Sequence, residues 1–190
     1  MSIFAICYIF VGLFIIIFLL TKIFRKAFIS YSRKFLADNG IDSFEWPIAF
    51  HTIDVAIEAP DKTYLFGRKP GKTTWQFIGG FVDPIDDSAA ESATRELGEE
   101  TSIQIPIEQS RRMKYIGSYK INDSRYVKSR NKVITSFYKV SITSVEAVQA
   151  KASDDIEEVK FFKLGEMKDI IAIQHKELLS ELLMYNLNNE

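Results

Sequence analysis

The stretch GGFVDPIDDSAAESATRELGEETSI, residues 79–103, limits the fold more than any other part of the chain. Ser88 is followed three residues later by Glu91, a pairing typical of a helix-capping box, so we predict that a helix begins here. At about 100° per residue, one face of that helix carries only small or apolar side chains. These side chains are Ala90, Ala93 and Leu97. The helix is therefore expected to pack against a core along this face.

Three glutamates, Glu96, Glu99 and Glu100, border that apolar face. Carboxylates this close repel one another unless a cation compensates them. Arg95 stands four residues from both Glu91 and Glu99, a spacing at which it neutralises and orients them. A solvated acidic face is the ordinary alternative. Because the ligands are hard oxygens with no cysteine or histidine cluster, the pattern favours bound Mg²⁺ or Mn²⁺.

Short apolar runs separated by turn residues follow residue 50 and predict a sheet. The strand candidates are Phe50–Glu58, Tyr64–Arg68, Trp75–Ile78, Lys114–Ile121, Lys132–Ser141 and Val159–Leu164. Two helices are expected among them, at about 88–100 and about 174–186. This mixture predicts an α+β or α/β sandwich in which helices flank a central sheet.

The N-terminal part of the chain has a different character. Residues 3–20 hold 18 consecutive uncharged positions, which as a helix would measure roughly 27 Å and nearly span a bilayer. A buried core helix and a secretory signal are the alternatives, but nothing basic precedes this run, as a signal would require. We predict a transmembrane anchor at residues 1–22, a basic juxtamembrane connector at 23–45 and a folded domain at 46–190.

The residues that follow the anchor predict its orientation. The five basic side chains on this flank, with no acidic one among them, are Lys22, Arg25, Lys26, Arg33 and Lys34. Basic flanks stay in the cytoplasm, so we expect a single-pass membrane protein with its N-terminus outside and its folded domain in the cytoplasm. The same basic collar suits contact with anionic membrane lipid.

Charge and cysteine content exclude several classes of function. Residues 35–190 contain 19 basic and 25 acidic residues, a net charge of about −6, which argues against general nucleic-acid binding. The only cysteine, Cys7, lies in the apolar run, which excludes an intrachain disulfide and cysteine-based chemistry in the folded domain. His51 and His175 are too far apart in sequence to form a motif, and we expect neither to be catalytic.

The carboxylate stretch resembles the Nudix box, G-x5-E-x7-R-E-U-x-E-E-x-G-U, in which U is a bulky apolar residue. Gly80 matches the leading glycine, and the second half is matched in register by Arg95, Glu96, Leu97, Glu99, Glu100 and Ile103. Two positions depart from the pattern. The first acid is Asp87, one residue late, which implies a bulge in the loop. Ser102 replaces the later glycine, where a left-handed turn is expected.

The resemblance implies the Nudix α/β/α sandwich with a mixed sheet, and hydrolysis of a nucleoside diphosphate linked to another group. It also implies the roles of individual residues. Glu96, Glu99 and Glu100 would hold divalent ions, with the backbone carbonyl of Gly80 as a further metal ligand, while Arg95 orients the carboxylates. Such ions neutralise the phosphates and lower the pKa of a water for in-line attack. The three glutamates and Arg95 are therefore the expected catalytic residues.

Two segments outside the box, FGRKPGKTTWQFIGGFVDP and YIGSYKINDSRYVKSRNKVITSFYKV, look like the Nudix portion of the bifunctional nicotinamide-mononucleotide adenylyltransferases. The likeness covers roughly residues 50–165. It implies ADP-ribose as the substrate, with AMP and ribose 5-phosphate as the products.

Five side chains are candidates for contacting that substrate. Arg68 either pairs with a phosphate or is an exposed cation at a strand end. Trp75 and Phe77 either stack on adenine or belong to the core, the more usual place for aromatic strand residues. Arg125 and Tyr126 lie in a polar loop and are better candidates for substrate contact.

Several alternatives stay open at this point. Asp154 and Asp155, before the last strand, are candidates for a general base or members of a solvated turn. Other nucleotide substrates of the same chemistry are NADH, a nucleotide sugar and a dinucleoside polyphosphate. A catalytically silent nucleotide-sensing module at the membrane belongs to a different class, although such modules commonly lose box glutamates that this chain retains. A homodimer is a further open alternative.

Overall fold

The strand β1 (Ala49–Glu58) buries side chains on both of its faces. Ile53, Val55 and Ile57 belong to one cluster of core residues and Ala56 to another, since successive side chains of a strand point to opposite sides. The computed structural model describes residues 48–123, 125–126 and 131–189. β1 is the strand that these two layers of core share.

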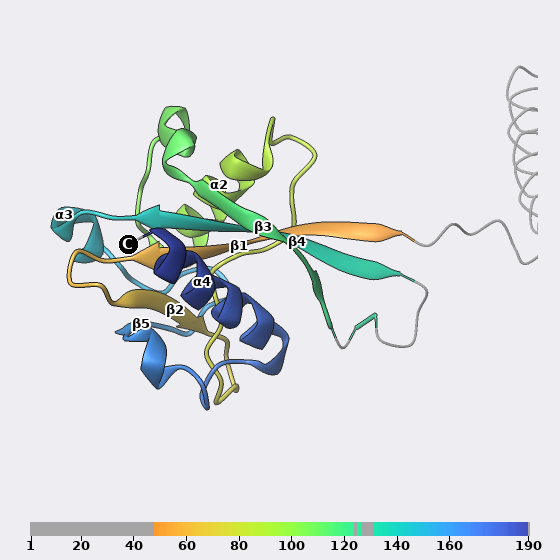
Figure 1. The fold of residues 1–190 in the computed structure, drawn as a ribbon. Coiled ribbons are helices and arrows are strands. Elements are labelled where there is room, and N and C mark those ends of the chain that lie inside the picture. Colours follow the sequence, from red (N-terminus) through yellow and green to blue (C-terminus); the bar gives the residue numbers. More distant parts are fainter. Residues whose placement is uncertain (1–47, 124, 127–130, 190) are drawn as a thin grey trace, which may run out of the picture. The chain divides into compact units, whose positions relative to one another are not determined.

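Five strands form one mixed sheet in the order β3-β4-β1-β2-β5 (Figure 1). The other strands are β2 (Tyr64–Arg68), β3 (Lys114–Ile121), β4 (Lys132–Ser141) and β5 (Glu158–Phe162). β1 and β4 pair in parallel, and the other neighbours are antiparallel. These strands lie where the sequence predicts them, and the predicted mixed sheet is confirmed.

β1 and β2 pair only beside the turn that joins them. The register covers residues 57–58 of β1 and 64–65 of β2. Farther along, the segment 75–81 makes isolated bridges to both strands, pairing Gln76 with Gly67 and Ile78 with Val55. The prediction of a continuous strand at Trp75–Ile78 is therefore wrong, because this segment bridges two diverging strands in turn. The glycines that follow it are held against β1.

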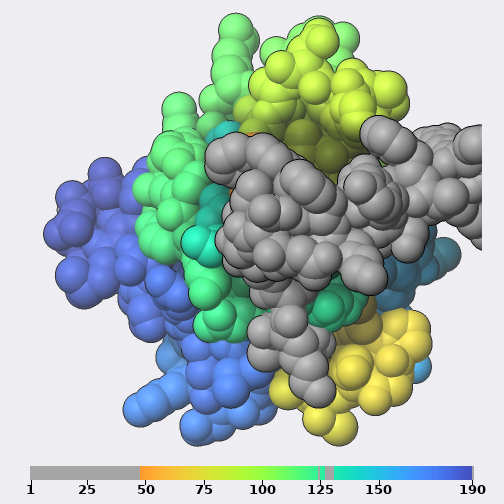
Figure 2. Space-filling model, turned by 90° about the vertical axis from the view of Figure 1, so that its right-hand side faces the viewer, coloured from red at the N-terminus to blue at the C-terminus, as the bar shows by residue number. Residues whose placement is uncertain are grey.

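Two long helices cover opposite faces of the sheet, α2 (Ala89–Thr101) and α4 (Lys176–Asn189) (Figure 1). In the space-filling view the yellow-green residues before α2 lie at the top and the dark-blue C-terminal residues lie at the left (Figure 2). Both predicted helices are confirmed. α4 begins two residues late because residues 173–175 form a 3-10 turn, η3 (Ile173–His175).

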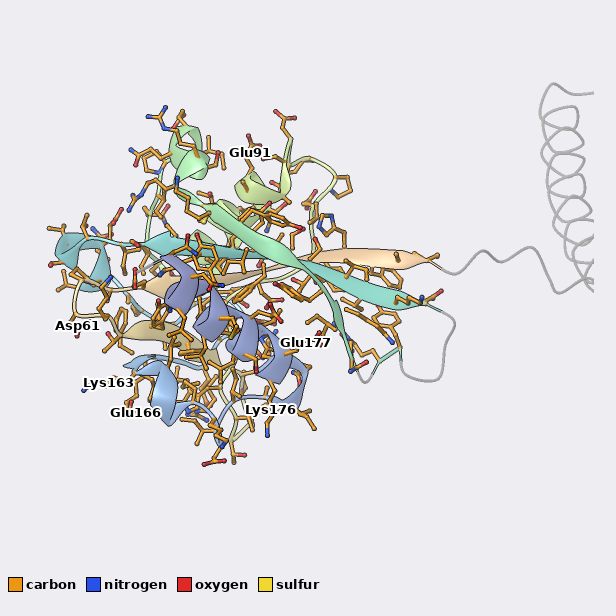
Figure 3. All side chains as sticks on the ribbon, viewed as in Figure 1. Asp61, Glu91, Lys163, Glu166, Lys176 and Glu177 are labelled. Carbon is orange, nitrogen blue, oxygen red and sulfur yellow. The ribbon has the colours of Figure 1, made fainter. Side chains whose placement is uncertain are left out.

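Shorter elements complete the described part of the chain. They are the helix α3 (Ser144–Ala147) and the 3-10 turns η1 (Ile107–Arg112) and η2 (Leu164–Glu166). Charged side chains cover the outer surfaces of the helices, as Lys176 and Glu177 on α4 illustrate (Figure 3). The division is not complete, because Leu183, Met184 and Leu187 of α4 are exposed and Glu100 of α2 is buried.

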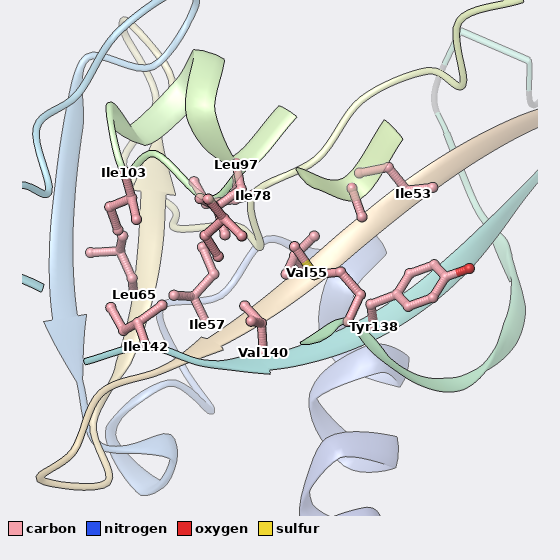
Figure 4. Close-up of a cluster of buried hydrophobic side chains, with 13 residues drawn as sticks. Ile53, Val55, Ile57, Leu65, Ile78, Leu97, Ile103, Tyr138, Val140 and Ile142 are labelled. Atoms are coloured by element: carbon pink, nitrogen blue, oxygen red, sulfur yellow. The ribbon is translucent and has the colours of Figure 1, made fainter. Parts of the chain in front are cut away.

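The cluster under α2 fixes the helix that carries the glutamates. Ala93 and Leu97 are fully buried there and meet Ile53, Val55 and Ile57 of β1 (Figure 4). Burial of one such leucine contributes about 2 kcal/mol relative to exposure. The predicted apolar face of the helix is confirmed, and it sets the rotation of α2 about its axis.

Aromatic rings dominate the cluster under α4. Phe77 packs against Phe66 and Phe137 at ring-centroid distances of 5.0 and 4.9 Å. Leu178 and Leu182 of α4 close this cluster from outside. The two faces of the sheet are therefore covered by separate cores, one for each helix.

The predicted anchor at residues 1–22 and connector at 23–45 lie outside the described residues. Among residues 48–189, as far as the structure describes them, no helix combines the length and apolarity that crossing a membrane requires.

Candidate active site

Local bonds at both ends of α2 hold the glutamate-bearing helix. Ser88 Oγ accepts the N–H of Glu91 at 3.2 Å, which confirms the predicted helix start. The carboxylate of Glu91 takes the N–H of Asp87 at 3.0 Å, one residue before the position a capping box uses. At the other end Ser102 has a φ of 60°. The left-handed turn expected there is confirmed, with serine in a conformation that favours glycine.

Glu100 is the buried member of the glutamate group, with 2% of its surface exposed. Its Oε2 accepts the backbone N–H of Gly79 at 2.9 Å. Burial raises the pKa of Glu100 to about 8, although this bond favours the charged form. A carboxyl group that resists ionisation at neutral pH is a usual sign of a site that awaits a compensating charge.

The loop before β5 reaches the same carboxyl group. The N–H of Ser153 donates to the backbone carbonyl of Glu100 at 3.1 Å, and the neighbouring carboxyl group of Asp155 contributes to the raised pKa of Glu100. Lys69, just after β2, forms an ion pair with Asp155. Burial works against the charge of Asp155, but Lys69 outweighs it and lowers the pKa of this aspartate. The structure thus brings one of the two predicted general-base candidates directly to Glu100.

Two adjacent glycines allow the backbone to approach the glutamates. A Cβ on Gly80 would lie 2.6 Å from the carboxylate atoms of Glu96. A Cβ on Gly79, whose φ is 156°, would lie 2.1 Å from the carbonyl oxygen of Ile53. Any larger residue would therefore displace either the glutamate or β1.

Gly80 was predicted to offer its carbonyl to a metal. That oxygen accepts the N–H of Ile53 at 2.9 Å. A carbonyl oxygen has two lone pairs, so this bond leaves one acceptor position. The bond also fixes the peptide of Gly80 beside the carboxylate of Glu96.

Arg95 supplies positive charge between two of the glutamates. Its Nη1 lies 2.9 Å from Glu96 Oε1 and 2.8 Å from Glu99 Oε2. Arg95 and Glu99 also line a hollow of about 450 Å³. The predicted contact of Arg95 with Glu99 is confirmed and Glu96 is a second partner, whereas Glu91, also predicted from its spacing, accepts the N–H of Asp87 instead. The charge of Arg95 therefore compensates part of the repulsion between Glu96 and Glu99.

The acidic residue of the loop that pairs with Arg95 is Asp86, whereas the residue predicted as the first acid of the box is Asp87. Asp86 Oδ2 lies 3.1 Å from Arg95 Nη2 and accepts the hydroxyl of Ser92 at 2.7 Å. Counted from Gly80, Asp86 has the regular five-residue spacing of the box. The extra residue therefore lies between Asp86 and Arg95 and not between Gly80 and the acid, so the spacing from Gly80 is the sequence signal that points to Asp86.

The residue types fit a hard divalent ion. Glu96, Glu99, Glu100 and Asp155 offer carboxylate oxygens, the donors that Mg²⁺ and Mn²⁺ prefer. Burial raises the pKa of Glu96 as well as that of Glu100. Within the described residues, however, no three carboxylate, histidine or cysteine side chains converge on one point. Arg95 holds Glu96 and Glu99 in this arrangement, so binding an ion requires these two side chains to turn.

Arg125 and Tyr126 lie beside the loop that begins the box. The ring of Tyr126 is 4.6 Å from that of Phe50, and Phe50 contacts Phe81 edge-on at 6.2 Å. The guanidinium of Arg125 lies 5.4 Å from the ring of Phe81. Phe81 in turn directs its backbone carbonyl to Arg95 at 3.2 Å. The structure therefore brings these two substrate candidates to the edge of the glutamate group.

Arg125 is itself paired with Asp123 at 2.6 Å. The other three substrate candidates are held within the fold. Phe77 is fully buried between Phe66 and Phe137 and has no open ring face, so the stacking hypothesis is wrong for it. Trp75 is 9% exposed and packs against a neighbouring ring. Arg68 is paired with Glu157 at 2.9 Å and with Glu158 at 2.7 Å. Its charge is therefore already compensated by carboxylates.

A buried polar pair on the α4 side was not predicted. His175 Nδ1 accepts the N–H of Phe77 at 3.2 Å and lies 3.6 Å from Asp54 Oδ1. Thr135 donates its hydroxyl to the other carboxyl oxygen of Asp54 at 2.7 Å. The signal in the sequence was an aspartate within the otherwise apolar run of residues 53–57. His175 thereby holds the segment that leads to Gly79 and Gly80.

Comparison with known proteins identifies the family. A family model, the NUDIX domain, matches residues 51–182. The chain belongs to the Nudix family. Because it also carries the box glutamates on one helix, it is a Nudix pyrophosphohydrolase. The comparison with curated proteins gave no match.

Solved structures share the Nudix fold at low sequence identity. The Nudix domain of Shewanella oneidensis NrtR, in complex with ADP ribose, is 19% identical with a TM-score of 0.58, over 76% of this chain and 92% of that one. A bifunctional NMN adenylyltransferase/ADP ribose pyrophosphatase from Francisella tularensis is 23% identical with a TM-score of 0.53, over 84% of this chain and 46% of that one. The same type of protein from Francisella tularensis, complexed with AMP and a Mn ion, is 21% identical with a TM-score of 0.52, over 87% of this chain and 47% of that one.

Proposed function

We propose that this Nudix pyrophosphohydrolase cleaves ADP-ribose to AMP and ribose 5-phosphate, with Mg²⁺ or Mn²⁺ as cofactor. One observation carries the hydrolytic part of the proposal. The paired glycines 79 and 80 bring backbone against both Glu100 and Glu96. This arrangement gathers buried carboxylates beside a backbone segment at the end of the sheet, where a pyrophosphate and its counter-ions need a compact oxygen-rich site.

Glu96, Glu99 and Glu100 would hold the divalent ion. When bound there, the ion supplies positive charge to the pyrophosphate oxygens and acidifies water. The protein holds the metal-binding side chains in position. α2 is fixed by its buried Leu97 and by the caps at its ends, and Gly79 holds the carboxylate of Glu100 through its N–H. Side chains held this way lose little freedom when the substrate binds.

Glu100 and Asp155 are the proposed residues for proton transfer. With a pKa of about 8, Glu100 carries a proton at neutral pH in this arrangement. Asp155 is kept ionised by Lys69 and faces Glu100. The loop with Asp154 and Asp155 is therefore the proposed source of the general base, since an ionised carboxylate within reach of water can accept its proton.

Arg125 and Tyr126 are the proposed substrate contacts. A guanidinium suits a phosphate, and an aromatic ring offers a stacking face for adenine. Two proteins of the same fold support the choice of ADP-ribose, one solved with ADP ribose and the other described as an ADP ribose pyrophosphatase. Trp75 and Phe77 are left out of this role because they belong to the core.

A substrate panel tests the proposal. The full-length protein in neutral detergent is incubated with ADP-ribose, NADH, a nucleotide sugar and a dinucleoside polyphosphate, each with Mg²⁺ or Mn²⁺, and the products are separated by chromatography. ADP-ribose should give the highest kcat/KM, with AMP and ribose 5-phosphate in equal amounts. A higher kcat/KM for another nucleotide would replace the substrate assignment. Absence of turnover on the whole panel would favour the nucleotide-sensing alternative.

The proposal includes a membrane anchor at residues 1–22, with the Nudix domain on the cytoplasmic side. Its support is the uncharged run at residues 3–20 and the basic collar that follows. The protein should stay in the membrane pellet after alkaline carbonate washing, and protease added to intact cells should leave residues 46–190 uncut. Release by the wash would refute the anchor. A homodimer is not part of the proposal, because one copy of the domain carries all the box residues.

A further inference from the structure

A second hollow, of about 610 Å³, lies away from the glutamate group. Its lining residues are Arg111, Arg112, Lys114, Lys139, Ser141 and Tyr185. They come from η1, the start of β3, the end of β4 and α4. None of them lies on α2 or on the glycine segment, so the hollow is separate from the candidate active site.

Positive charge is concentrated in this hollow in an otherwise acidic domain. Residues 47–190 contain 19 basic and 22 acidic residues, hence a net charge of −3. Four of the six lining side chains are nonetheless basic. A cluster of cations in an acidic protein is costly unless neighbouring acids or a bound anion compensate it.

Two of the four cations are compensated within the protein. Arg112 pairs with Glu146 at 2.7 Å, which lowers the pKa of Glu146 to about 2. Lys139 pairs with Glu58 at 3.2 Å. Because both acids are already bound, neither is free to hold a metal cation in the hollow.

The other two cations, Arg111 and Lys114, are exposed at the rim. Within the part of the chain that the structure describes, their side chains make no hydrogen bond or ion pair. The hollow therefore keeps an uncompensated charge of about +2, which favours an anion.

The walls of the hollow are held in place before any ligand arrives. Arg112 also donates to the backbone carbonyl of Ser141 at 3.0 Å. Lys139 donates to Asn186 Oδ1 at 2.8 Å and lies 5.9 Å from the ring of Tyr185. A preformed concave site loses less entropy on binding, and small-molecule sites commonly measure about 300–1,000 Å³.

We infer that this hollow is a binding site for a phosphate-bearing anion, with Arg111 and Lys114 as the side chains that contact the phosphate. A guanidinium offers paired N–H donors to two phosphate oxygens, and an ammonium adds a point charge. The ring of Tyr185 forms an apolar wall for the rest of the ligand. Free phosphorylated compounds and anionic lipid headgroups share this chemistry, so the two sources are separated by experiment.

Chemical footprinting of Lys114 tests the inference. The full-length protein in neutral detergent with EDTA is treated with a water-soluble acetylating reagent, and the acetylation rate of each lysine is measured by mass spectrometry. EDTA removes the ions on which phosphate binding at the glutamate group depends. Inorganic tripolyphosphate should slow acetylation of Lys114 in a saturable way, about tenfold at roughly ten times Kd. The exposed Lys168 serves as the internal reference and should not change.

A lipid arm separates the two sources. The protein is reconstituted in phosphatidylcholine discs with or without phosphatidylglycerol. Protection of Lys114 only in the discs with the anionic lipid would assign the site to headgroups, whereas protection only by tripolyphosphate would assign it to a free phosphorylated compound. No protection of Lys114 in either arm would overturn the inference.

Matched variants identify the site. Arg111→Gln should abolish the protection of Lys114, while Lys151→Gln, which removes one exposed charge elsewhere, should leave it intact. Glu96→Gln should also leave it intact, because that residue belongs to the other site. Equal loss of protection in the Arg111 and Lys151 variants would reduce the effect to general charge and refute a defined site.

Discussion

The carboxylate of Glu100 accepts the backbone N–H of Gly79 at 2.9 Å, which ties the last turn of α2 to the segment held against β1. One helical turn earlier on α2, the carboxylate of Glu96 lies so close to Gly80 that a Cβ there would be 2.6 Å from it. The two contacts set the separation of the glutamates from the backbone. Activity is therefore expected to depend on both glutamates.

Glu100→Gln and Glu96→Gln should each lower kcat by about 10²-fold or more, because each removes a charged ligand from a site that must neutralise phosphate. The fold should survive, since glutamine keeps the size of the side chain and is neutral at positions where burial disfavours a charge. The measurement is kcat on ADP-ribose at saturating metal, with circular dichroism as the check on folding.

Glu91→Gln is the matched control on the same helix. Glu91 accepts the N–H of Asp87 and contacts no other box glutamate in the described residues. Its loss should cost about 1 kcal/mol of stability and leave kcat within a few-fold of the wild type. Near-normal turnover in both the Glu96 and Glu100 variants would refute their assignment as metal ligands.

The buried residues Asp54 and His175 should each make the free energy of unfolding depend on pH, and the two contributions should have opposite signs. Burial raises the pKa of Asp54 from 3.8 to about 7, so its contribution to the free energy of unfolding falls as pH rises between these values. Burial lowers the pKa of His175 from 6.5 to about 4, so its contribution falls as pH drops between these values. The two terms oppose each other from about pH 4 to 6.5.

Single variants should separate the two terms. Relative to the wild type, His175→Gln leaves only the aspartate term and should become more stable as pH falls from 7 to 4. Asp54→Asn leaves only the histidine term and should become less stable over the same range. Urea unfolding at several pH values measures both, with the exposed Asp169→Asn as control. Parallel pH profiles for the two variants would contradict the paired arrangement.

Ser102→Gly should raise the free energy of unfolding by up to about 1 kcal/mol. Ser102 has a φ of 60°, where a Cβ is unfavourable and glycine is the usual residue. The same substitution at Ser180, in the interior of α4, should instead cost about 0.5 kcal/mol. Thermal and urea unfolding check both. A loss of stability in Ser102→Gly would mean that its side chain makes an interaction outweighing the backbone strain.

The double variant Arg125→Ala, Tyr126→Ala should raise KM for ADP-ribose about tenfold, equivalent to about 1.4 kcal/mol, with a smaller change in kcat. Arg68→Ala should change KM little, because Glu157 and Glu158 already compensate its charge. Steady-state kinetics on ADP-ribose and NADH would show whether the effect is selective. A larger rise in KM from Arg68→Ala than from the double variant would reverse the assignment.

The sequence alone determined the elements that depend on neighbouring residues. The start of α2 at Ser88, its apolar face at Ala93 and Leu97, and the left-handed residue after it were all predictable. Capping, helical periodicity and strand alternation act over a few positions, so they can be read along the chain. The spacing of the Nudix box also lies within one short stretch of the sequence, so the family and its metal-dependent hydrolysis could be predicted from the sequence.

Tertiary structure alone decided which residues of distant segments meet. It placed Asp155 and Lys69 beside Glu100. It also buried Phe77, which the sequence left open as either a core residue or a ligand contact. These outcomes depend on how diverging strands and loops pack around two separate cores, and packing joins residues whose separation in the sequence carries no information about their distance in space.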